Sequence, residues 1–494
     1  MIELFLTGLI TSLRPENLLA IVFGVTWGII GGAIPGITGS LAMALLLPFT
    51  FGMTVYQAVP MLAAVYVGAE YGSSIPAILI KTPGSPSSAV TVADGYALHL
   101  KGEGGKALTV SLVSGFIGGF ISVILLVAFA IPLSRFGLMF GPSQFALLGI
   151  MGLSVVGSIT GGNMFKGLLS AAFGLLLTTI GLDPFVGTPR FTFGYFRLLE
   201  GLSIIPIIIG LFAIGEVLIQ VSSRNIHGKS NMEKVRFRWP SKEDFKRFVP
   251  VACVGGFIGT FIGVIPGPGT TVAAFVSYNQ VRQFCKNKEN FGKGDIRGIA
   301  APESANNACP AGTLVPLLAL GIPGSNAAAI VLVGFSIHGV QLGPRLFAAS
   351  PEIPYAIMAS MMVAQFLMLG LGFFMIRPIV KITSISPKYM AIAIIMFGLI
   401  GAFATTNDPF AMVIACIFGV IGFLMKKFGF SPAATVLAFV LGRMIENNLR
   451  RALVLSDGSL DIFFSGPINI VLVTIIFGTL FFSVFDVVRK RFIK

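Results

Sequence analysis

The sequence predicts an all-α polytopic membrane protein, on the evidence of its composition, the length of its apolar runs and their lack of alternation. Of the 494 residues, 55% are hydrophobic and only 11% are charged, and the mean hydropathy is +0.91. A soluble protein of this length needs far more polar surface. Apolar runs of about 17–25 residues, long enough to cross a bilayer as helices, recur along the chain. They do not alternate apolar and polar residues as the strands of a membrane barrel do.

Examples of such apolar runs are 107–133, 201–221, 357–376, 390–404 and 467–485. Together with shorter runs, they predict roughly ten to twelve transmembrane spans. The N-terminal segment has no basic region and no small-residue cleavage site, so we expect no removable signal peptide.

A basic polar segment divides the chain near its midpoint. Residues 222–247 contain eight Lys or Arg and three acidic residues. Because basic loops favour the cytoplasm, we expect a cytoplasmic linker at 222–247 and a cytoplasmic C-terminal tail. This predicts an N-terminal transmembrane repeat at 1–221 and a C-terminal transmembrane repeat at 248–494. Such loops also explain the net charge of +14, and no aromatic-basic patch indicates nucleic-acid binding.

Two pairs of broken apolar segments occur in the same order on the two sides of the linker. "GAIPGITGSLAMA" (32–44) matches "GVIPGPGTTVAAF" (263–275), and "YGSSIPAILIKTPGSPSSA" (71–89) matches "AGTLVPLLALGIPGSNAAA" (311–329). An interior proline costs a helix ~3 kcal/mol or more, so we expect helices to break at each Pro-Gly pair. Internal duplication explains both matches and is common in transporters. Inverted repeats are favoured over parallel ones, because broken helices that meet at mid-membrane suit inversion.

The four breaks form the candidate substrate site. Non-helical backbone at membrane depth must be buried in protein or line a watery cavity, so the breaks are expected to meet. A restarting helix offers free N–H groups and a positive dipole end, which suit a carboxylate. Freed carbonyls suit a cation such as Na⁺. The candidate substrate-binding residues are Pro35, Gly36, Thr38, Ser40, Lys81, Gly84, Ser85, Ser88, Pro266, Gly267, Thr270, Thr271, Gly324, Ser325 and Asn326. The alternative interpretation is that the breaks are kinks that serve helix packing.

The candidates for ion coupling are Glu70, Glu303, Asn306 and Asn307. Charged residues inside membrane segments are functional by default, and amide oxygens are suited to a cation or a carboxylate partner. Glu303 precedes Asn306 by three positions, so the two share a helical face. The alternative is that this segment caps a helix or holds a loop.

Three further charged residues have structural alternatives. Lys81 is placed to reach a substrate carboxylate or to extend to a membrane interface. Asp94 is expected to hold a turn, and Asp408 to cap a helix that begins at Pro409.

Enzyme motifs are absent from the sequence. It contains no Walker A motif, no G-x-S-x-G and no H-E-x-x-H. The four cysteines have no CxxC spacing and the three histidines are far apart, which predicts neither a disulfide framework nor a metal site. We expect no enzyme activity and no cofactor, only a coupling ion, Na⁺ or H⁺.

Five long segments carry a family resemblance. They are "GAIPGITGSLAMALLLPFTFGM", "YGSSIPAILIKTPGSPSSAVTVADGYAL", "GVIPGPGTTVAAFVSYN", "FGKGDIRGIAAPESANNACPAGTLVPLLALGIPGS" and "IHGVQLGP". In these segments the chain resembles the large membrane subunit of the tripartite tricarboxylate transporters, the TctA family. The resemblance implies ion-gradient-driven uptake of a tricarboxylate or related organic acid across the bacterial inner membrane. It also implies a small membrane subunit and a periplasmic substrate-binding protein as partners.

Two positions depart from the pattern expected of this family. Lys81 stands where the family usually has asparagine, and Glu70 stands where it has an uncharged residue. A new base and a new acid near one break predict an altered substrate or proton coupling. The other functions that the sequence leaves open are an anion channel, a secondary transporter without a binding protein, and a membrane-embedded enzyme.

Overall fold

The computed structural model describes residues 2–34, 37–159, 164–222, 239–267, 269–382 and 387–492. Most of these residues are helical, which confirms the predicted fold class, and they include one antiparallel hairpin of β1 (Gly181–Leu182) and β2 (Pro189–Arg190). Within this part of the chain, seven helical stretches are long and apolar enough to cross a membrane. Two of the shorter apolar helices, Gly39–Gly52 and Asn326–Ile337, directly follow Pro-Gly segments.

The chain forms two compact units, and each takes residues from both sides of the linker. Unit 1 comprises Met1–Ser134 and Gln220–Ile394, and unit 2 comprises Arg135–Ile219 and Ile395–Lys494. Three helices contain the points where the chain passes from one unit to the other, namely α6 (Gly104–Gly137), α10 (Gly215–Ser222) and α17 (Pro387–Thr406). Residues 223–238 of the expected linker lie outside the described residues.

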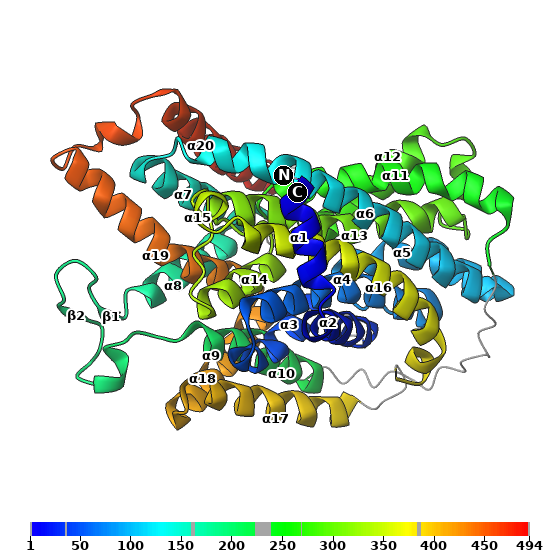
Figure 1. Cartoon of the computed structure of the whole chain (residues 1–494), viewed down its shortest axis with the longest axis horizontal. Helices are drawn as coiled ribbons and strands as arrows, with labels where there is room; N and C mark the ends of the chain where they lie inside the picture. Colours follow the sequence, from blue (N-terminus) through cyan, green and yellow to red (C-terminus); the bar gives the residue numbers. More distant parts are fainter. Residues whose placement is uncertain are drawn as a thin grey trace. The chain divides into compact units, whose positions relative to one another are not determined.

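The remaining elements fall within one unit each (Figure 1). Unit 1 contains α1 (Ile2–Ser12), α2 (Pro15–Ala33), α3 (Gly39–Leu46), η1 (Leu47–Gly52), α4 (Val55–Ile80), η2 (Pro86–Ala89), α5 (Thr91–Leu98), η3 (His99–Glu103), α11 (Lys242–Val264), α12 (Gly269–Phe284), η6 (Lys288–Asn290), α13 (Ile296–Leu320), α14 (Asn326–Ile337), α15 (Leu346–Ala349) and α16 (Glu352–Ile382). Unit 2 contains α7 (Pro142–Ile159), α8 (Met164–Thr178), β1, β2, η4 (Phe196–Leu198), α9 (Ile204–Ile208), η5 (Ile209–Ile214), α18 (Pro409–Lys427), α19 (Pro432–Leu455), η7 (Leu460–Phe463) and α20 (Pro467–Phe492).

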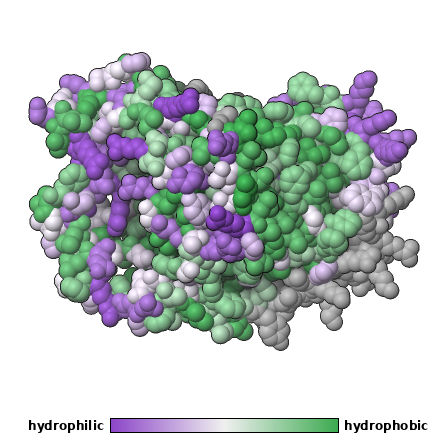
Figure 2. All heavy atoms as spheres, viewed as in Figure 1, coloured by the Kyte–Doolittle hydropathy of each residue, from purple (hydrophilic) through white to green (hydrophobic). Residues whose placement is uncertain are grey.

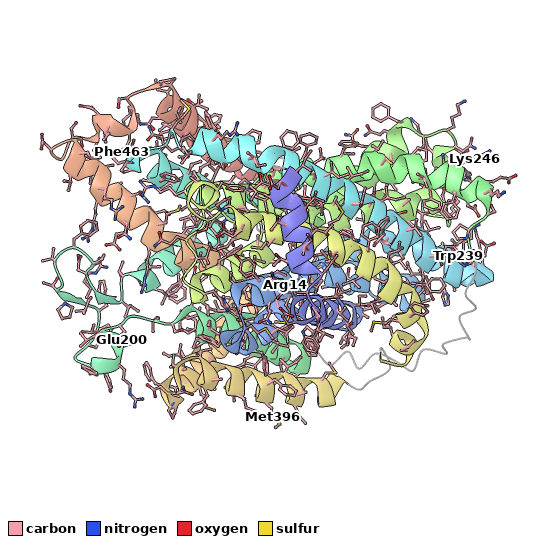
Figure 3. All side chains as sticks on the ribbon, viewed as in Figure 1. Arg14, Glu200, Trp239, Lys246, Met396 and Phe463 are labelled. Atoms are coloured by element: carbon pink, nitrogen blue, oxygen red, sulfur yellow. The ribbon has the colours of Figure 1, made fainter. Side chains whose placement is uncertain are left out.

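The outer helices present apolar side chains to their surroundings. Figure 2 shows a broad hydrophobic area on the viewed face, over the region where α6 lies in Figure 1. Ile124 and Phe129 of α6 are among the exposed large hydrophobic residues. The first turns of α11, by contrast, carry exposed charged residues, among them Lys246, which is labelled in Figure 3. Apolar helix sides with polar ends are what a bilayer requires.

Two buried helices, α4 and α13, form the centre of unit 1, and a glycine-rich helix packs parallel to each. Glycines at every fourth position of α2 lie so close to α4 that a Cβ added to each would come within 2.4 Å of a main-chain carbonyl oxygen of α4. The pairs are Gly24 with Met61, Gly28 with Val65 and Gly32 with Ala69. The corresponding pairs of α11 and α13, at 2.7, 2.2 and 2.7 Å, are Gly255 with Ala301, Gly259 with Ala305 and Gly263 with Cys309. Small residues at this spacing allow helix backbones to approach closely in membranes.

Each glycine-rich helix is half of a helical hairpin, and in the second hairpin Pro266 and Gly267 form the turn at the tip. Gly32, near the end of α2, lies beside Ala69 in the middle of α4, yet α4 itself starts at Val55. The chain must therefore return along α3 and η1 before α4 can begin. The second hairpin repeats this path, since α11 ends beside the middle of α13 and α12 leads back to the start of α13.

The two central helices end in the same way, with a left-handed residue that turns the chain back. Lys81 has φ 59° and Gly321 has φ 75°. In each case the N–H of the next residue donates to a proline carbonyl at 3.3 Å, from Thr82 to Pro76 and from Ile322 to Pro316. This left-handed ending is a common helix C-terminus. After this turn the chain runs back along the central helix. The second Pro-Gly segment of each part therefore lies beside the end of the glycine-rich helix of that part, Gly84 beside Gly32 and Gly324 beside Gly263.

The helices α4 and α13 cross in opposite directions. Glu303 interacts with Ser74, Asn306 donates to the Glu70 carbonyl at 3.2 Å, and Cys309 interacts with Tyr66. Residue numbers thus rise along one helix as they fall along the other. The antiparallel crossing brings the middle of each helix to the hairpin tip of the other.

Candidate functional site

The carboxyl group of Glu70 lies where parts of three breaks meet. An added Cβ on Gly39, the first residue of α3, would be 3.8 Å from Glu70 Oε1. The hydroxyl of Ser87, after the second break, donates to Oε2 at 3.2 Å. Thr270, in the first turn of α12, also hydrogen-bonds this side chain. Breaks from both sides of the linker therefore converge on one side chain of α4.

The two breaks of the C-terminal part are joined directly. The N–H of Gly267 donates to the Gly324 carbonyl at 3.0 Å. An added Cβ on Gly324 would be 2.7 Å from the Gly263 carbonyl oxygen. Ser325 then caps α14 by accepting the N–H of Ala328 at 3.1 Å. Its hydroxyl also lies 3.1 Å from the hydroxyl of Tyr66 on α4, which links this break to the N-terminal part.

The N-terminal part has a matching close contact. An added Cβ on Gly84 would be 2.3 Å from the Gly32 carbonyl oxygen. The Gly84 N–H donates to the main-chain carbonyl of Ser73 at 3.1 Å. Pro35 and Gly36 lie outside the described residues. Thr38 caps α3 by accepting the N–H of Leu41 at 3.3 Å.

The remaining predicted substrate-binding residues lie at helix starts or in local turns. Ser40, Thr271 and Asn326 are in the first turns of α3, α12 and α14, and Pro266 is in the turn between α11 and α12. Ser85 and Ser88 cap the short turn η2. Lys81 is exposed, and its ammonium lies 5.9 Å from the centre of the Tyr96 ring.

The electrostatic character of this region follows from the helix starts. The N-termini of α3 and α12 leave N–H groups without intrahelical partners and carry partial positive charge. Hydroxyls from Ser87, Thr270 and Ser325 add neutral donors. This arrangement is suited to a carboxylate, and Glu70 itself supplies one.

The four ion-coupling candidates divide into two neighbouring places. Asn306 contacts Glu70, as described above. Glu303 is fully buried in α13, where Thr91 donates to its Oε1 and Ser111 to its Oε2 at 3.1 Å. Asn307 donates to the Glu303 carbonyl at 3.1 Å. The alternative in which Glu303 caps a helix is wrong, because Asp295 caps α13 by accepting the N–H of Arg297 at 3.0 Å.

Several residues of this region were missed by the sequence analysis. Tyr66, Thr91 and Ser111 are ordinary residues of apolar helices, and only their long-range partners mark them. The Tyr66 partner, Ser325, is 259 positions away in the sequence, and Glu303 is 212 positions from Thr91 and 192 from Ser111. No local sequence pattern predicts hydrogen bonds between residues so far apart in the sequence.

The expectation for Asp408 is confirmed, and that for Asp94 is confirmed in part, because Asp94 lies within α5 and holds a turn of a loop distant in the sequence. Asp94 Oδ1 accepts the N–H groups of Gly292, Gly294 and Asp295 at 2.8–3.0 Å, which holds the loop before α13. Asp408 caps α18 by accepting the N–H of Phe410 at 2.9 Å, with Pro409 as the first helical residue.

A cavity of about 390 Å³ lies away from the breaks, where α1, α2, α4 and α16 meet. Its polar lining includes Arg14, Glu16, Tyr56 and Glu352, and Arg14 is labelled in Figure 3. No residue that lines it belongs to a Pro-Gly segment. The cavity is therefore separate from the convergence at Glu70.

Comparison with known proteins identifies the family. The family model described as "Tripartite tricarboxylate transporter TctA family" matches residues 18–437. An uncharacterized 52.8 kDa protein in the TAR-I ttuC' 3' region of Agrobacterium vitis is 37% identical over 465 residues, which cover 93% of this chain and 92% of that protein. An uncharacterized protein in the TAR-II ttuC' 3' region of the same organism is 36% identical over 210 residues, which cover 42% of this chain and 87% of that protein. No solved structure matches. The chain therefore belongs to the tripartite tricarboxylate transporter TctA family, a family of multi-pass transporters that work in three-component systems.

Proposed function

We propose that this chain is the large transmembrane subunit of a binding-protein-dependent carboxylate uptake transporter, driven by an ion gradient across the bacterial inner membrane. Its substrate is a tricarboxylate or related organic acid. The observation that carries the proposal is the convergence of breaks from both sides of the linker around Glu70. Broken helices that meet near mid-membrane are the usual substrate sites of secondary transporters.

The matching contacts of the two parts support a duplicated, inverted architecture. Gly32 and Gly263 occupy equivalent hairpin positions and receive equivalent contacts, from Gly84 and Gly324. The antiparallel crossing of α4 and α13 is the relation that inversion produces. Inverted repeats permit alternating access, because two repeats related by a pseudo-two-fold axis in the membrane plane can exchange conformations around a fixed site.

The partners follow from the family. A periplasmic substrate-binding protein would deliver the carboxylate to the outer face, and a small membrane subunit would complete the transporter. The chain would take its driving force from Na⁺ or H⁺, since its sequence carries no Walker A motif.

The test is uptake into proteoliposomes that contain all three components. Labelled di- and tricarboxylates should accumulate against their gradient when a Na⁺ or pH gradient is imposed, and unlabelled substrate inside should stimulate entry of labelled substrate. Flux that only follows the substrate gradient, with no stimulation by internal substrate, would show an anion channel instead. Full uptake without the binding protein would identify a transporter of the simpler kind.

A further inference from the structure

We propose that Glu303, Thr91, Ser111 and Ser74 form the binding site of a monovalent cation, Na⁺ or H⁺, next to the convergence of the breaks. Only the role of this cation in coupling rests on the proposed function. Its binding is a property of the chain alone and is testable without any carboxylate.

The first argument is the isolation of the Glu303 charge. Glu303, Thr91, Ser111 and Ser74 each have an exposure of 1% or less. Among the described residues, the side-chain partners of the Glu303 carboxylate are hydroxyls, and no basic side chain forms an ion pair with it. A buried ionised carboxylate without a compensating charge is strongly disfavoured. A bound proton or a bound cation supplies that charge.

The second argument is the set of oxygen atoms around Glu303. Hydroxyls reach it from three other helices, Ser74 of α4, Thr91 of α5 and Ser111 of α6. The Ser74 and Ser111 oxygens are 2.7 Å apart. An all-oxygen set with a single carboxylate suits a hard cation of low charge better than a transition metal, which prefers nitrogen or sulfur ligands.

The third argument is that two further buried oxygens near Glu303 have no hydrogen-bond partner. They are the Tyr71 hydroxyl, which interacts electrostatically with Glu303, and Oδ1 of Asn307, whose amide nitrogen donates to the Glu303 carbonyl. Both residues are fully buried. Unpartnered buried oxygens are rare in native structures, and a bound ion is one explanation of them.

The position of Glu303 explains how the cation acts on the substrate site. Asn306 is one helical turn further along α13, and its amide donates to the Glu70 carbonyl. A change in charge at Glu303 also acts directly on Glu70, with which it interacts electrostatically. The titratable groups that face Glu303 are Glu70 and Tyr71 of α4. Neutralising Glu303 would therefore favour an anion at the neighbouring breaks.

The experiment measures saturable binding of radioactive Na⁺ to the purified full chain at pH 7, without carboxylate. Glu303→Gln should abolish binding, and Thr91→Val and Ser111→Ala should each weaken the affinity at least about tenfold. The matched controls are Thr109→Val and Ser360→Ala, which change buried hydroxyls that donate to carbonyls of their own helices and make no recorded hydrogen bond to Glu303. Both controls should bind Na⁺ like the wild type. Thr91→Val and Ser111→Ala keep the test valid if Glu303→Gln does not fold.

A second measurement separates Na⁺ from H⁺. If the wild type binds no Na⁺, infrared difference spectra between pH 5 and pH 9 should show a protonated carboxyl band that Glu303→Gln removes and Glu70→Gln retains. Either result supports a cation site at Glu303. The proposal is overturned if Na⁺ binding is the same in all variants, or if neither Na⁺ binding nor a Glu303 carboxyl band is found. A chain that binds the cation but transports no carboxylate would contradict the proposed function and leave this site standing.

Discussion

At the scale of single residues, Lys81 combines backbone strain with an exposed charge. It ends α4 in the left-handed conformation, φ 59°, at the position where Gly321 ends α13 with φ 75°. Side-chain-bearing residues occupy this conformation at a cost of roughly 1–2 kcal/mol, which glycine avoids. A function of the ammonium, which lies 5.9 Å from the centre of the Tyr96 ring, would account for a lysine at this strained position.

Lys81→Gly tests this interpretation by removing the strain and the charge together. The free energy of unfolding should rise by about 1 kcal/mol because glycine tolerates the left-handed backbone. If the ammonium binds substrate, KM for carboxylate uptake should rise about tenfold or more, as expected for a lost hydrogen bond to a charged group. Thermal unfolding and uptake kinetics measure the two effects. Unchanged KM in both Lys81→Gly and Lys81→Asn would show that Lys81 only extends to an interface.

Gly84 is a residue at which packing leaves no room for a side chain. A Cβ there would be 2.3 Å from the Gly32 carbonyl oxygen and 2.8 Å from Ser73 Cα. Both obstacles are backbone, so Gly84→Ala must displace the second break from the hairpin tip. We expect the rate of uptake to fall at least about tenfold. A tenfold decrease requires the activation free energy of transport to rise by only about 1.4 kcal/mol.

Gly370→Ala in α16 is the matched control for Gly84→Ala, because no atom lies within 4 Å of a Cβ added there. It should transport normally. Wild-type uptake by Gly84→Ala would mean that the contact between break and hairpin tip is not needed for transport.

Individual residues also show the limits of the sequence. The ends and restarts of the broken helices could be predicted, because proline and glycine act locally on the backbone. Helices end at Ile80 and Val264, and helices restart at Gly269 and Asn326. The hydroxyls on Glu303 could not be predicted, because α4, α5 and α6 bring them together only in the folded chain.

At the scale of elements, the loop between α8 and α9 is held by a charge network. Asp183 accepts the N–H groups of Phe185 and Val186 at 2.8 and 3.1 Å and pairs with Arg450 at 2.9 Å and Arg190 at 3.4 Å. The Arg450 hydrogen bond and then the Phe185 N–H lower the pKa of Asp183 below its ordinary value of 3.8. A lowered folded-state pKa stabilises the fold above the unfolded-state pKa, and this contribution is lost as the pH falls through the folded-state pKa.

The pH dependence of this loop follows from that sign. The Phe185 and Val186 amides should keep constant protection from hydrogen exchange between pH 7 and pH 4.5, after correction for intrinsic rates, and should lose it only below pH 3.8. Asp183→Asn should reduce protection already at pH 7. Glu200→Gln, which changes an exposed acid of the same loop (Figure 3), should not. Loss of protection in the wild type near pH 6 would contradict the assignment to Asp183.

The element scale also contains the largest difference between expectation and structure. The breaks and their matching order were visible in the sequence, but the parallel packing of α2 on α4 was not. The signal was present as glycines at every fourth position, Gly24, Gly28 and Gly32. Glycine is common in membrane helices, so the spacing of these glycines in one sequence does not show which neighbouring helix they pack against.

At the scale of the whole molecule, the compact units do not follow the order of the chain, since each contains residues from both sides of the linker. The sequence predicted two repeats at 1–221 and 248–494, and this duplication remains a proposal that the matching contacts support. Ile204–Ser222 is a candidate membrane span that follows the loop carrying β1 and β2. The proposal of a cytoplasmic linker therefore predicts that this loop lies on the outer side.

The central claim is that a carboxylate binds where the breaks converge, and substrate protection of Thr271→Cys tests it most directly. The background should have Cys253, Cys285, Cys309 and Cys416 replaced by alanine. Thr271 is half-buried in the first turn of α12. The account predicts that transported carboxylates, and not a non-transported anion such as sulfate, slow the reaction of this cysteine with a small thiol reagent in proportion to their occupancy. Reaction at the same rate with and without saturating substrate, in a variant that still transports, would contradict it.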